Sequence, residues 1–396
     1  MLTRAIQKAF PNRDRKGAAH ANNTAMLPLL TDILPSLYGM LQSRVIFGVG
    51  SIEKLPAEFE QLGASRALVV STPQQRELAM DVAARLGSRA AGVFDRAVMH
   101  VPVEVAQAAG EEARRLSADC CVAVGGGSTI GLAKAIVLTG DPASPLPILA
   151  LPTSYAGSEM TPIWGVTKDG RKITGRDARV LPRTVLYDPA LTVSMPAGLA
   201  ATSGINAMAH CVEALYAKDA TPVISAIAEE GIRTLAASLP LVVAERVGQP
   251  PNIEARSQAM FGAWLGGVSL GFAGMALHHK LCHTLGGVFN LPHAETHTVV
   301  LPHAVAYNAE AAQEAMARVA RGLGTESGAD SAAAGLYDLA AELGAPLSLA
   351  AIGMRAEDLD RAADLATADP YDNPRTVTRE GIRELLQNAF DGRRPG

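Results

Sequence analysis

Short apolar runs alternate with longer amphipathic stretches over the first half of the chain. Apolar runs of strand length fall within residues 44–51, 66–73, 91–98, 120–124, 145–152 and 183–191. Stretches with helical periodicity, such as residues 103–116, separate several of these runs. This alternation is typical of a parallel sheet covered by helices, so we expect an α/β domain over residues 40–195.

The pattern changes after Pro196, where strand signals almost vanish. Ala-rich and Leu-rich stretches with a helical period replace them at residues 201–217, 222–239 and 253–270. We therefore expect an all-α domain over residues 196–396. A cleft between the two domains is the natural place for an active site.

Composition and charge exclude several classes of protein. The 396 residues suit two domains, and 35 Lys and Arg against 39 Asp and Glu leave no cationic surplus to bind nucleic acid. No apolar run is long enough to predict a membrane span. Four cysteines without a Cys-x-x-Cys pair indicate a reducing compartment, so we expect a cytoplasmic protein. Residues 1–39 are basic but lack the apolar core of a secretory signal, and we expect a disordered extension there.

A glycine-rich turn separates an apolar run from a helical stretch. It consists of Gly125, Gly126, Gly127 and Ser128. Glycines let the backbone approach a ligand closely, and the free N–H groups of a helix N-terminus bind pyrophosphate. The motif is neither Gly-x-Gly-x-x-Gly nor a Walker loop, and a tight strand-to-helix turn is the alternative interpretation.

A second polar loop follows the apolar run at residues 145–152. It contains Thr153, Ser154 and Ser158. Ligands of open α/β sheets bind beside the carboxyl ends of the strands, where both loops are expected to lie. We therefore expect both loops to bind a dinucleotide cofactor, although the second is alternatively a plain connection.

Histidines are concentrated in the second half of the chain, and six of the nine fall within residues 278–303. Three pairs are spaced four residues apart, which places each pair on one helix face: Asn206 and His210, His279 and His283, and His293 and His297. A glycine break and a proline separate the last two pairs, so their imidazoles are expected to converge from a helix and a turn. Several imidazoles on neighbouring elements indicate metal binding or proton transfer.

Four motifs, in this order, carry a resemblance to a known family. They are GGGSTIGLAK, LPTSYAGSE, GINAMAHCVEAL and HHKLCHTLGGVFNLPH, and they resemble the iron-containing alcohol dehydrogenase superfamily from about residue 40 nearly to the end. The resemblance implies a dinucleotide-binding α/β domain followed by an all-α domain, a fold like that of dehydroquinate synthase, and a homodimer. It also implies which positions match the family's metal ligands: Asn206, His210, His279 and His293.

The first of these positions departs from the family, which has an aspartate there. Asn206 offers a neutral oxygen in place of the one anionic ligand, so a divalent metal should bind more weakly. We expect that no metal is required. If one is bound, it would be held by His210, His279 and His293, since three histidines alone form a zinc site.

Two further departures concern the cofactor. Gly131 stands where the family's glycine motif has an aspartate, and residues 66–73 end in Ser71, Thr72 and Pro73. An acidic residue at that strand end would bind the adenosine ribose and repel a 2′-phosphate. Because it is missing, we expect NADH or NADPH to serve as cofactor.

These departures, with stretches such as PTSYAGSEMTPIWG and RKITGRDARVLPRTVLYDP, resemble the maleylacetate reductase branch of the superfamily. The resemblance implies NAD(P)H-dependent reduction of the carbon–carbon double bond of maleylacetate to 3-oxoadipate in the degradation of aromatic compounds. The alkene is conjugated with a ketone, so hydride transfer develops enolate charge that hydrogen-bond donors stabilise without a metal. Asn206 also leaves the pocket without a negative charge that would repel a dicarboxylate.

The resemblance also assigns roles to the candidate residues. We expect His283 to supply the proton after hydride transfer, and His279, with His210 and His293 nearby, to bind the carboxylate or oxo group. Lys172, expected in a loop with Arg171 and Arg176, is a candidate contact to a cofactor phosphate or a carboxylate. We expect His278, His297 and His303 to be structural.

Two other functions remain open from the sequence. One is a metal-dependent alcohol or lactaldehyde dehydrogenase on the same fold. The other is a nucleotide-binding protein without catalytic activity, against which the retained histidine set argues.

Overall fold

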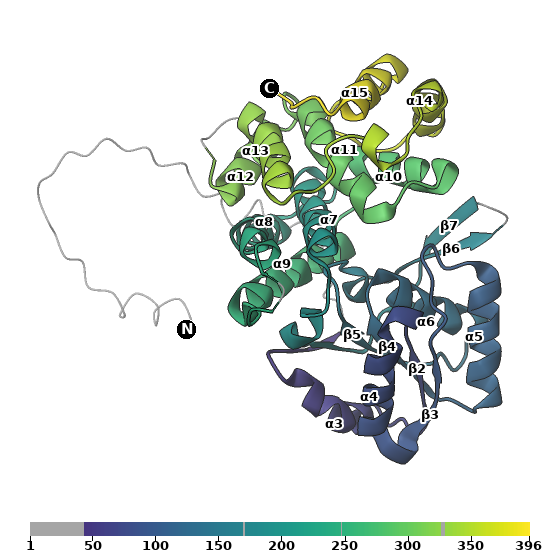
Figure 1. Cartoon of the computed structure of the whole chain (residues 1–396). Coiled ribbons are helices and arrows are strands. Elements are labelled where there is room, and N and C mark those ends of the chain that lie inside the picture. Colours follow the sequence, from purple (N-terminus) through teal and green to yellow (C-terminus); the bar gives the residue numbers. More distant parts are fainter. Residues whose placement is uncertain (1–42, 169–170, 247, 326–328) are drawn as a thin grey trace, which may run out of the picture. The chain divides into compact units, whose positions relative to one another are not determined.

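The computed structural model of the chain describes residues 43–168, 171–246, 248–325 and 329–396. The expected N-terminal extension, residues 1–39, lies outside the described residues. Within them the chain order is an α/β half followed by a helical half, as the sequence pattern predicts (Figure 1). We keep the division at residues 195 and 196 as a proposal.

The α/β half is built on a six-stranded parallel sheet with the strand order β1-β8-β5-β4-β2-β3. Its strands are β1 (Arg44–Phe47), β2 (Ala67–Val70), β3 (Ala90–Phe94), β4 (Cys120–Gly125), β5 (Ile148–Pro152) and β8 (Thr184–Tyr187). Every residue of β2, β4, β5 and β8 is buried, because helices cover both faces of the sheet. The apolar runs of the sequence are therefore continuous and do not alternate with polar residues.

Successive residues of the central strands enter two different cores. Leu68 and Cys121 point to the face covered by α5 (Val103–Arg115) and α6 (Gly127–Thr139). Val69 and Val122 point to the opposite face, covered by α3 (Leu55–Gln61) and α4 (Arg76–Leu86). The strand order reverses between β2 and β4, and in such sheets the ligand lies at the carboxyl ends of the strands beside that reversal. The fold thus predicts a ligand at the end of β4, where the glycine-rich turn begins.

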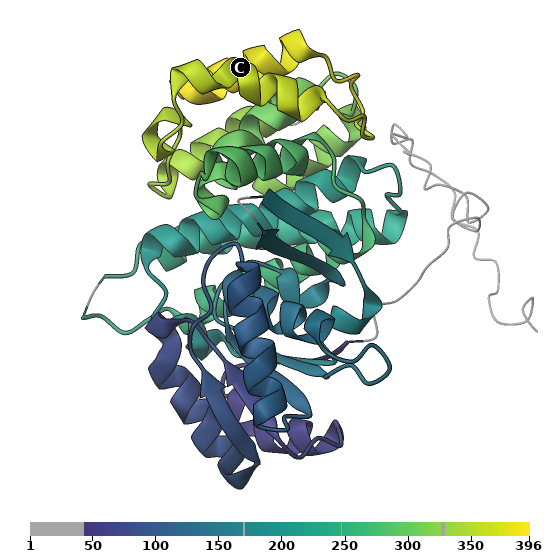
Figure 2. The same ribbon diagram turned by 90° about the vertical axis from the view of Figure 1, so that its right-hand side faces the viewer.

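A two-stranded antiparallel hairpin corrects one expectation from the sequence. Residues around Lys172, expected to form a loop, form β7 (Arg171–Arg176), which pairs with β6 (Ile163–Lys168). The β-branched residues Ile163, Val166 and Thr167 in β6 and Ile173 and Thr174 in β7 favour the extended conformation. Strand β6 packs against α6 and β7 packs against α10 (Leu277–Phe289), so the hairpin connects the two halves (Figure 2).

The helical half continues through the remaining helices, which are α7 (Ala197–Tyr216), α8 (Pro222–Val243), α9 (Ile253–Phe272), α11 (His293–Asn308), α12 (Gln313–Leu323), α13 (Ala329–Glu342), α14 (Leu359–Thr367) and α15 (Arg379–Asp391). Helix α7 is its centre: residues 200–215 are all buried, and α8, α9 and α11 pack around it. A helix that is apolar on all sides is expected at such a position. Among the described residues, no single helix is long and apolar enough to cross a membrane; α9 and α10 meet that criterion only together, with a bend of 95° between them.

Helix α10 corrects a second expectation, because it has no break at its glycines. The helix runs through Gly286 and Gly287 and ends at Asn290, whose φ of 54° reverses the chain before Pro292 starts α11. The two histidine pairs therefore lie on two complete helices.

The two halves meet at a close glycine contact. Gly157, in the loop after β5, has a φ of 78°, and a Cβ atom on Gly267 of α9 would lie 2.9 Å from the Gly157 carbonyl oxygen. A Cβ atom on the neighbouring Gly266 would lie 2.6 Å from the carbonyl oxygen of Ala207 in α7. Small residues thus bring α9 against both the β5 loop and the centre of the helical half.

Candidate active site

The glycine-rich turn leads from the end of β4 into α6. Gly125 has a φ of 155°, and a Cβ atom there would lie 2.7 Å from the side-chain oxygen of Gln75. Helix α6 starts at Gly127, and no side chain caps its N-terminus. Its first N–H groups therefore have no acceptor from a capping side chain and point toward the carboxyl edge of the sheet, where a pyrophosphate would accept from them.

The β5 loop lies against this turn. The Thr153 N–H donates to the Gly125 carbonyl at 3.2 Å, and the Gln75 amide donates to the Thr153 hydroxyl at 2.5 Å. A Cβ atom on Gly126 would meet the Ser154 hydroxyl at 2.6 Å. Of the hydroxyls predicted to bind cofactor, Thr153 and Ser154 therefore border the glycine turn together.

Ser158 lies elsewhere in the same loop, beside a buried lysine. The Lys134 ammonium donates to the Ser158 carbonyl at 2.7 Å and to its hydroxyl at 3.2 Å. It also donates to the carbonyls of Thr161 at 2.8 Å and Ile163 at 2.7 Å, so Lys134 fixes the course of the loop. Burial lowers the pKa of Lys134 to about 7.

The far part of the β5 loop reaches the histidines. A Cβ atom on Gly157 would lie 3.5 Å from Nδ1 of His210 on α7. The His210 ring stacks on His279 of α10, with 5.1 Å between ring centroids, and His283 lies one helical turn beyond at 6.1 Å from His279. One short loop therefore extends from the predicted pyrophosphate site to the predicted catalytic histidines.

Helix α11 completes the histidine cluster. The rings of His293 and His297 are 4.3 Å apart, and His297 is 4.8 Å from both His279 and His278. His278 and His297, which we expected to be structural, thus lie inside the cluster and are fully buried. His303 lies two helical turns further along α11.

Glu213 is a central residue that the sequence reasoning missed. Its buried carboxylate accepts from the His279 ring Nδ1 at 2.5 Å and from the His278 backbone N–H at 2.8 Å. A carboxylate only accepts, so Nδ1 of His279 carries the hydrogen and the neutral ring turns the lone pair of Nε2 into the site. The spacing of Asn206, His210 and Glu213 along one face of α7 is the signal that would have found it.

Several buried polar atoms in the cluster have no partner among the described residues. These atoms are Asn206 Oδ1, His210 Nδ1, His279 Nε2 and both ring nitrogens of His297. Buried polar atoms are normally paired, so this set is arranged to meet a ligand. Oxygen and imidazole nitrogen are ligands that iron or zinc accepts, and the residues therefore fit a metal chemically, although the set carries no charge.

Among the described residues, one trio has the spacing of a metal site, and it differs from the set that the family resemblance implies. One ligand atom each of His278, His279 and His297 lies within 4.8 Å of the others. However, His278 Nε2 is already paired with the His297 carbonyl at 3.0 Å, and Glu213 holds His279 Nδ1. The nitrogens left for a ligand are thus His279 Nε2 and those of His297.

The surroundings of the cluster disfavour the protonated form of its histidines. Burial, reinforced by the neighbouring imidazoles, lowers the pKa values of His210, His279 and His297 well below the usual range. His283 keeps contact with solvent, yet protein surrounds it closely enough to lower its pKa to about 4, with the Lys172 charge as the second cause. His283 is thus an exposed member of the histidine cluster.

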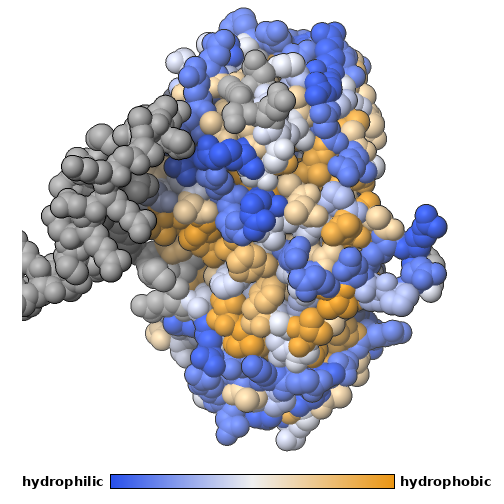
Figure 3. Space-filling view, turned by 90° about the vertical axis from the view of Figure 1, so that its left-hand side faces the viewer, coloured by the Kyte–Doolittle hydropathy of each residue, from blue (hydrophilic) through white to orange (hydrophobic). Residues whose placement is uncertain are grey.

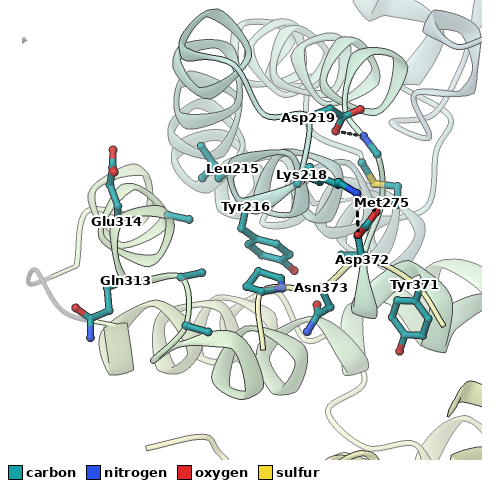
Figure 4. Close-up of a pocket in the computed structure, with 17 residues that line it drawn as sticks. Leu215, Tyr216, Lys218, Asp219, Met275, Gln313, Glu314, Tyr371, Asp372 and Asn373 are labelled. Atoms are coloured by element: carbon teal, nitrogen blue, oxygen red, sulfur yellow. Dashed lines mark hydrogen bonds and ion pairs between the residues drawn. The ribbon is translucent and has the colours of Figure 1, made fainter. Parts of the chain in front are cut away.

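A cavity in the helical half lies away from this cluster. It has a volume of about 870 Å³ and is lined by Tyr216, Lys218, Met275 and Tyr371, among others (Figure 4). Its link to the site is Tyr216, whose hydroxyl donates to Glu213 at 3.4 Å. We propose the active site at the histidines, because five unpaired buried polar atoms gather there, whereas the Tyr371 hydroxyl is the only such atom among the described residues that line the cavity.

Family models match both halves of the chain. Residues 42–189 match the model described as iron-containing alcohol dehydrogenase. Residues 200–390 match the model of the C-terminal domain of the same family. Together the two matches cover nearly all described residues.

Individual relatives narrow the assignment. The chain is 57% identical over 352 residues to the maleylacetate reductase of Burkholderia cepacia, covering 89% of this chain and 97% of the relative. It is 55% identical over 359 residues to that of Sphingobium indicum, covering 91% and 98%. The crystal structure of maleylacetate reductase from Agrobacterium tumefaciens superimposes with a TM-score of 0.84 at 51% identity, covering 91% of this chain and 99% of the other. The chain therefore belongs to the iron-containing alcohol dehydrogenase family, on its maleylacetate reductase branch.

Proposed function

We propose that this protein reduces the carbon–carbon double bond of maleylacetate with NADH or NADPH and releases 3-oxoadipate. The observation that carries the proposal is sequence identity of 57% and 55% to maleylacetate reductases, over 97% and 98% of their length. The site supports it, since the glycine-rich turn and a cluster of neutral imidazoles are joined by one loop. The substrate would arise in the degradation of aromatic compounds.

The cofactor is proposed to lie along the β5 loop. Its pyrophosphate would accept from the N-terminus of α6, with Gly125, Gly126, Gly127 and Ser128 as the turn and Thr153 and Ser154 at its side. The nicotinamide would then extend past Gly157 toward His210 and His279. Ser71, the residue after β2, has no carboxylate that would repel the 2′-phosphate of NADPH.

We propose that the reaction needs no metal. The reason is the donor set, in which Asn206 replaces the only anionic ligand. If a metal binds, His210, His279 and His293 would hold it, and it would polarise the oxo group of the substrate. The steps below use only side chains of this chain.

The protein's own residues suit an enolate-forming reduction. The hydride adds to one alkene carbon, and the electron pair of the double bond moves into the conjugated ketone as an enolate. The other alkene carbon then takes a proton, which we assign to His283. A bound dianion beside His283 favours the imidazolium form, so substrate binding itself would raise the low pKa of this acid.

His279 takes a different role from His283. Glu213 keeps the hydrogen of His279 on Nδ1, so neutral His279 offers a lone pair to the site and acts as an acceptor. His283 is therefore the residue that we expect to transfer the proton.

Replacing His283 by Ala should lower kcat by about 100-fold or more while the KM for NADH stays unchanged, as measured by steady-state kinetics. Near-normal kcat would remove His283 from the mechanism.

A metal-dependent alcohol or lactaldehyde dehydrogenase is the second candidate, and the unpaired imidazole nitrogens favour it. Following NADH oxidation with maleylacetate and NAD⁺ reduction with small alcohols separates the two candidates. Turnover of maleylacetate with identified 3-oxoadipate supports the proposal, and turnover of alcohols alone would replace it.

We also propose a cytoplasmic homodimer. All four cysteines are free and buried, as expected in a reducing compartment. Apolar patches between hydrophilic residues are visible on one face of the surface (Figure 3), and such patches are common at subunit interfaces. Light scattering coupled to size exclusion would give the mass, and a monomer would contradict the dimer.

A further inference from the structure

Lys172 lies on strand β7, which the sequence did not predict, and it packs against α10, the helix that carries His279 and His283. Its Cβ atom is 3.7 Å from the position of a Cβ atom on Gly287, so the lysine stem starts against α10. Gly287 is four residues beyond His283 and eight beyond His279, and the three residues share one face of the helix. Strand β7 therefore delivers Lys172 to the helix face that carries two of the proposed active-site histidines.

A second element approaches Lys172 from the other side. Thr167 is the hairpin partner of Lys172, and it donates through its hydroxyl to the His100 carbonyl at 2.9 Å and through its N–H to the Val101 carbonyl at 3.0 Å. Both His100 and Val101 have left-handed backbones, with φ of 65° and 46°. Such a conformation is costly for a β-branched residue and is held where surrounding structure requires it. The ring Nε2 of His100 is buried without a partner.

The charge of Lys172 has no counterpart among the described residues. No ion pair joins it to a carboxylate of those residues, and its side chain is half-buried. Burial lowers the pKa values of His100, His283 and His293, and the positive charge of the nearby Lys172 lowers them further. A partly buried ammonium without a counter-ion is unfavourable, and an anionic ligand removes that cost.

The cofactor and the substrate both carry negative charge, but at different ends of the site. The pyrophosphate is placed at the N-terminus of α6, whereas Lys172 lies against the end of α10 beside His283. The substrate is a dianion, and neutral imidazoles carry no full charge to balance it, while His279 presents only an acceptor. An ammonium at this position meets the remaining requirement for one of its two carboxylates.

We propose that Lys172 binds the substrate carboxylate on the far side of the ketone from the double bond and, with His100 beside it, makes the enzyme selective for dicarboxylates over monocarboxylates. This inference rests on the proposed reduction of maleylacetate. It narrows the role of Lys172, for which the sequence left open a contact to a cofactor phosphate or to a carboxylate, to the residue that determines substrate specificity.

The test compares Lys172→Met with wild type on two substrates, maleylacetate and cis-4-oxopent-2-enoate, which lacks the second carboxylate. Loss of a charged hydrogen bond should raise the KM for maleylacetate roughly 10- to 150-fold and leave the KM for NADH unchanged. The kcat/KM for the monocarboxylate should stay equal in both proteins. Lys172→Arg should recover part of the loss, and Lys168→Met, on the exposed end of the same hairpin, should behave as wild type.

Each other outcome overturns the inference. A higher KM for NADH alone would make Lys172 a cofactor contact, and an equal loss on both substrates would make it structural, which thermal melting and the Arg variant would reveal. Failure of wild type to reduce maleylacetate appears before any variant is measured, and it would overturn the proposed function itself.

Discussion

At the scale of single residues, Glu213 determines which nitrogen of His279 faces the site. Its carboxylate accepts from the His279 ring and from the backbone N–H groups of His278 and His279 at 2.8 and 3.4 Å. Position 206 holds an amide and no carboxylate, but seven residues later the Glu213 carboxylate binds the His279 ring at Nδ1. The carboxylate therefore lies on the Nδ1 side of the His279 ring, opposite the unpaired Nε2 that faces a ligand.

Glu213→Gln should weaken catalysis without affecting cofactor binding. An amide can accept from only one side and would turn its own N–H₂ toward backbone donors, so His279 would lose its fixed orientation. We expect kcat to fall about 10- to 100-fold, as for partners that orient active-site histidines. The KM for NADH should not change.

Steady-state kinetics with maleylacetate and NADH would measure both constants. Glu254→Gln, at an exposed position of α9, serves as the matched control. An unchanged kcat in Glu213→Gln would show that the hydrogen bond does not orient His279 in the working enzyme.

The sequence predicted which residues share a helix face better than it predicted how the helices meet. Spacing of four residues correctly paired Asn206 with His210 and His279 with His283, because helical periodicity is a local property. It could not reveal that Glu213 reaches a histidine 66 residues away, since that contact depends on how α7 packs against α10. The position of His297 inside the cluster could not be predicted for the same reason.

At the scale of elements, the glycine contact between α9 and the β5 loop holds the nucleotide and histidine regions together. Gly267 packs against Gly157, which in turn approaches His210. The side chains between these elements are too small to separate them. The distance between the glycine-rich turn and the histidine cluster therefore depends on Gly157 and Gly267, which have no side chain that could bind a ligand.

Gly267→Ala should destabilise the protein by about 1–3 kcal/mol, because the added methyl group would lie 2.9 Å from a backbone oxygen and 3.1 Å from the Met160 side chain. Gly198→Ala, in the first turn of α7, has no atom within 4 Å and should be neutral or stabilise by up to about 1 kcal/mol. Urea unfolding of the two variants measures the difference. Equal stabilities would mean that the contact is loose in solution.

Elements were predicted where the local pattern is strong. The parallel strands and the long helices followed from apolar runs and from helical periodicity. The β6–β7 hairpin was missed because its residues are half-exposed and charged, with only weak alternation. Helix α10 was wrongly interrupted at Gly286 and Gly287, since packing overrides the low helix propensity of glycine.

At the scale of the whole molecule, the buried histidines link stability to pH. His303 has a folded pKa of about 4, lowered by burial, against an ordinary value of 6.5. Between these values the unfolded chain binds more protons than the folded chain, so stability is complete above pH 6.5 and is lost as the pH falls toward 4.

The contribution of His303 can be measured separately. Between pH 8 and pH 5 the wild type should lose about 2 kcal/mol more unfolding free energy than His303→Gln, which has no titrating group there. Urea unfolding at several pH values gives the two slopes. Parallel slopes would show that His303 is not buried as a neutral side chain.

The central claim concerns the whole enzyme: a site of neutral imidazoles with an amide at position 206 reduces a double bond without a metal. The most direct measurement is maleylacetate-dependent NADH oxidation by protein that has been treated with a chelator and analysed for iron and zinc. The account predicts full activity and formation of 3-oxoadipate at far less than one metal ion per chain. Loss of activity on chelation that returns with stoichiometric iron or zinc would contradict it.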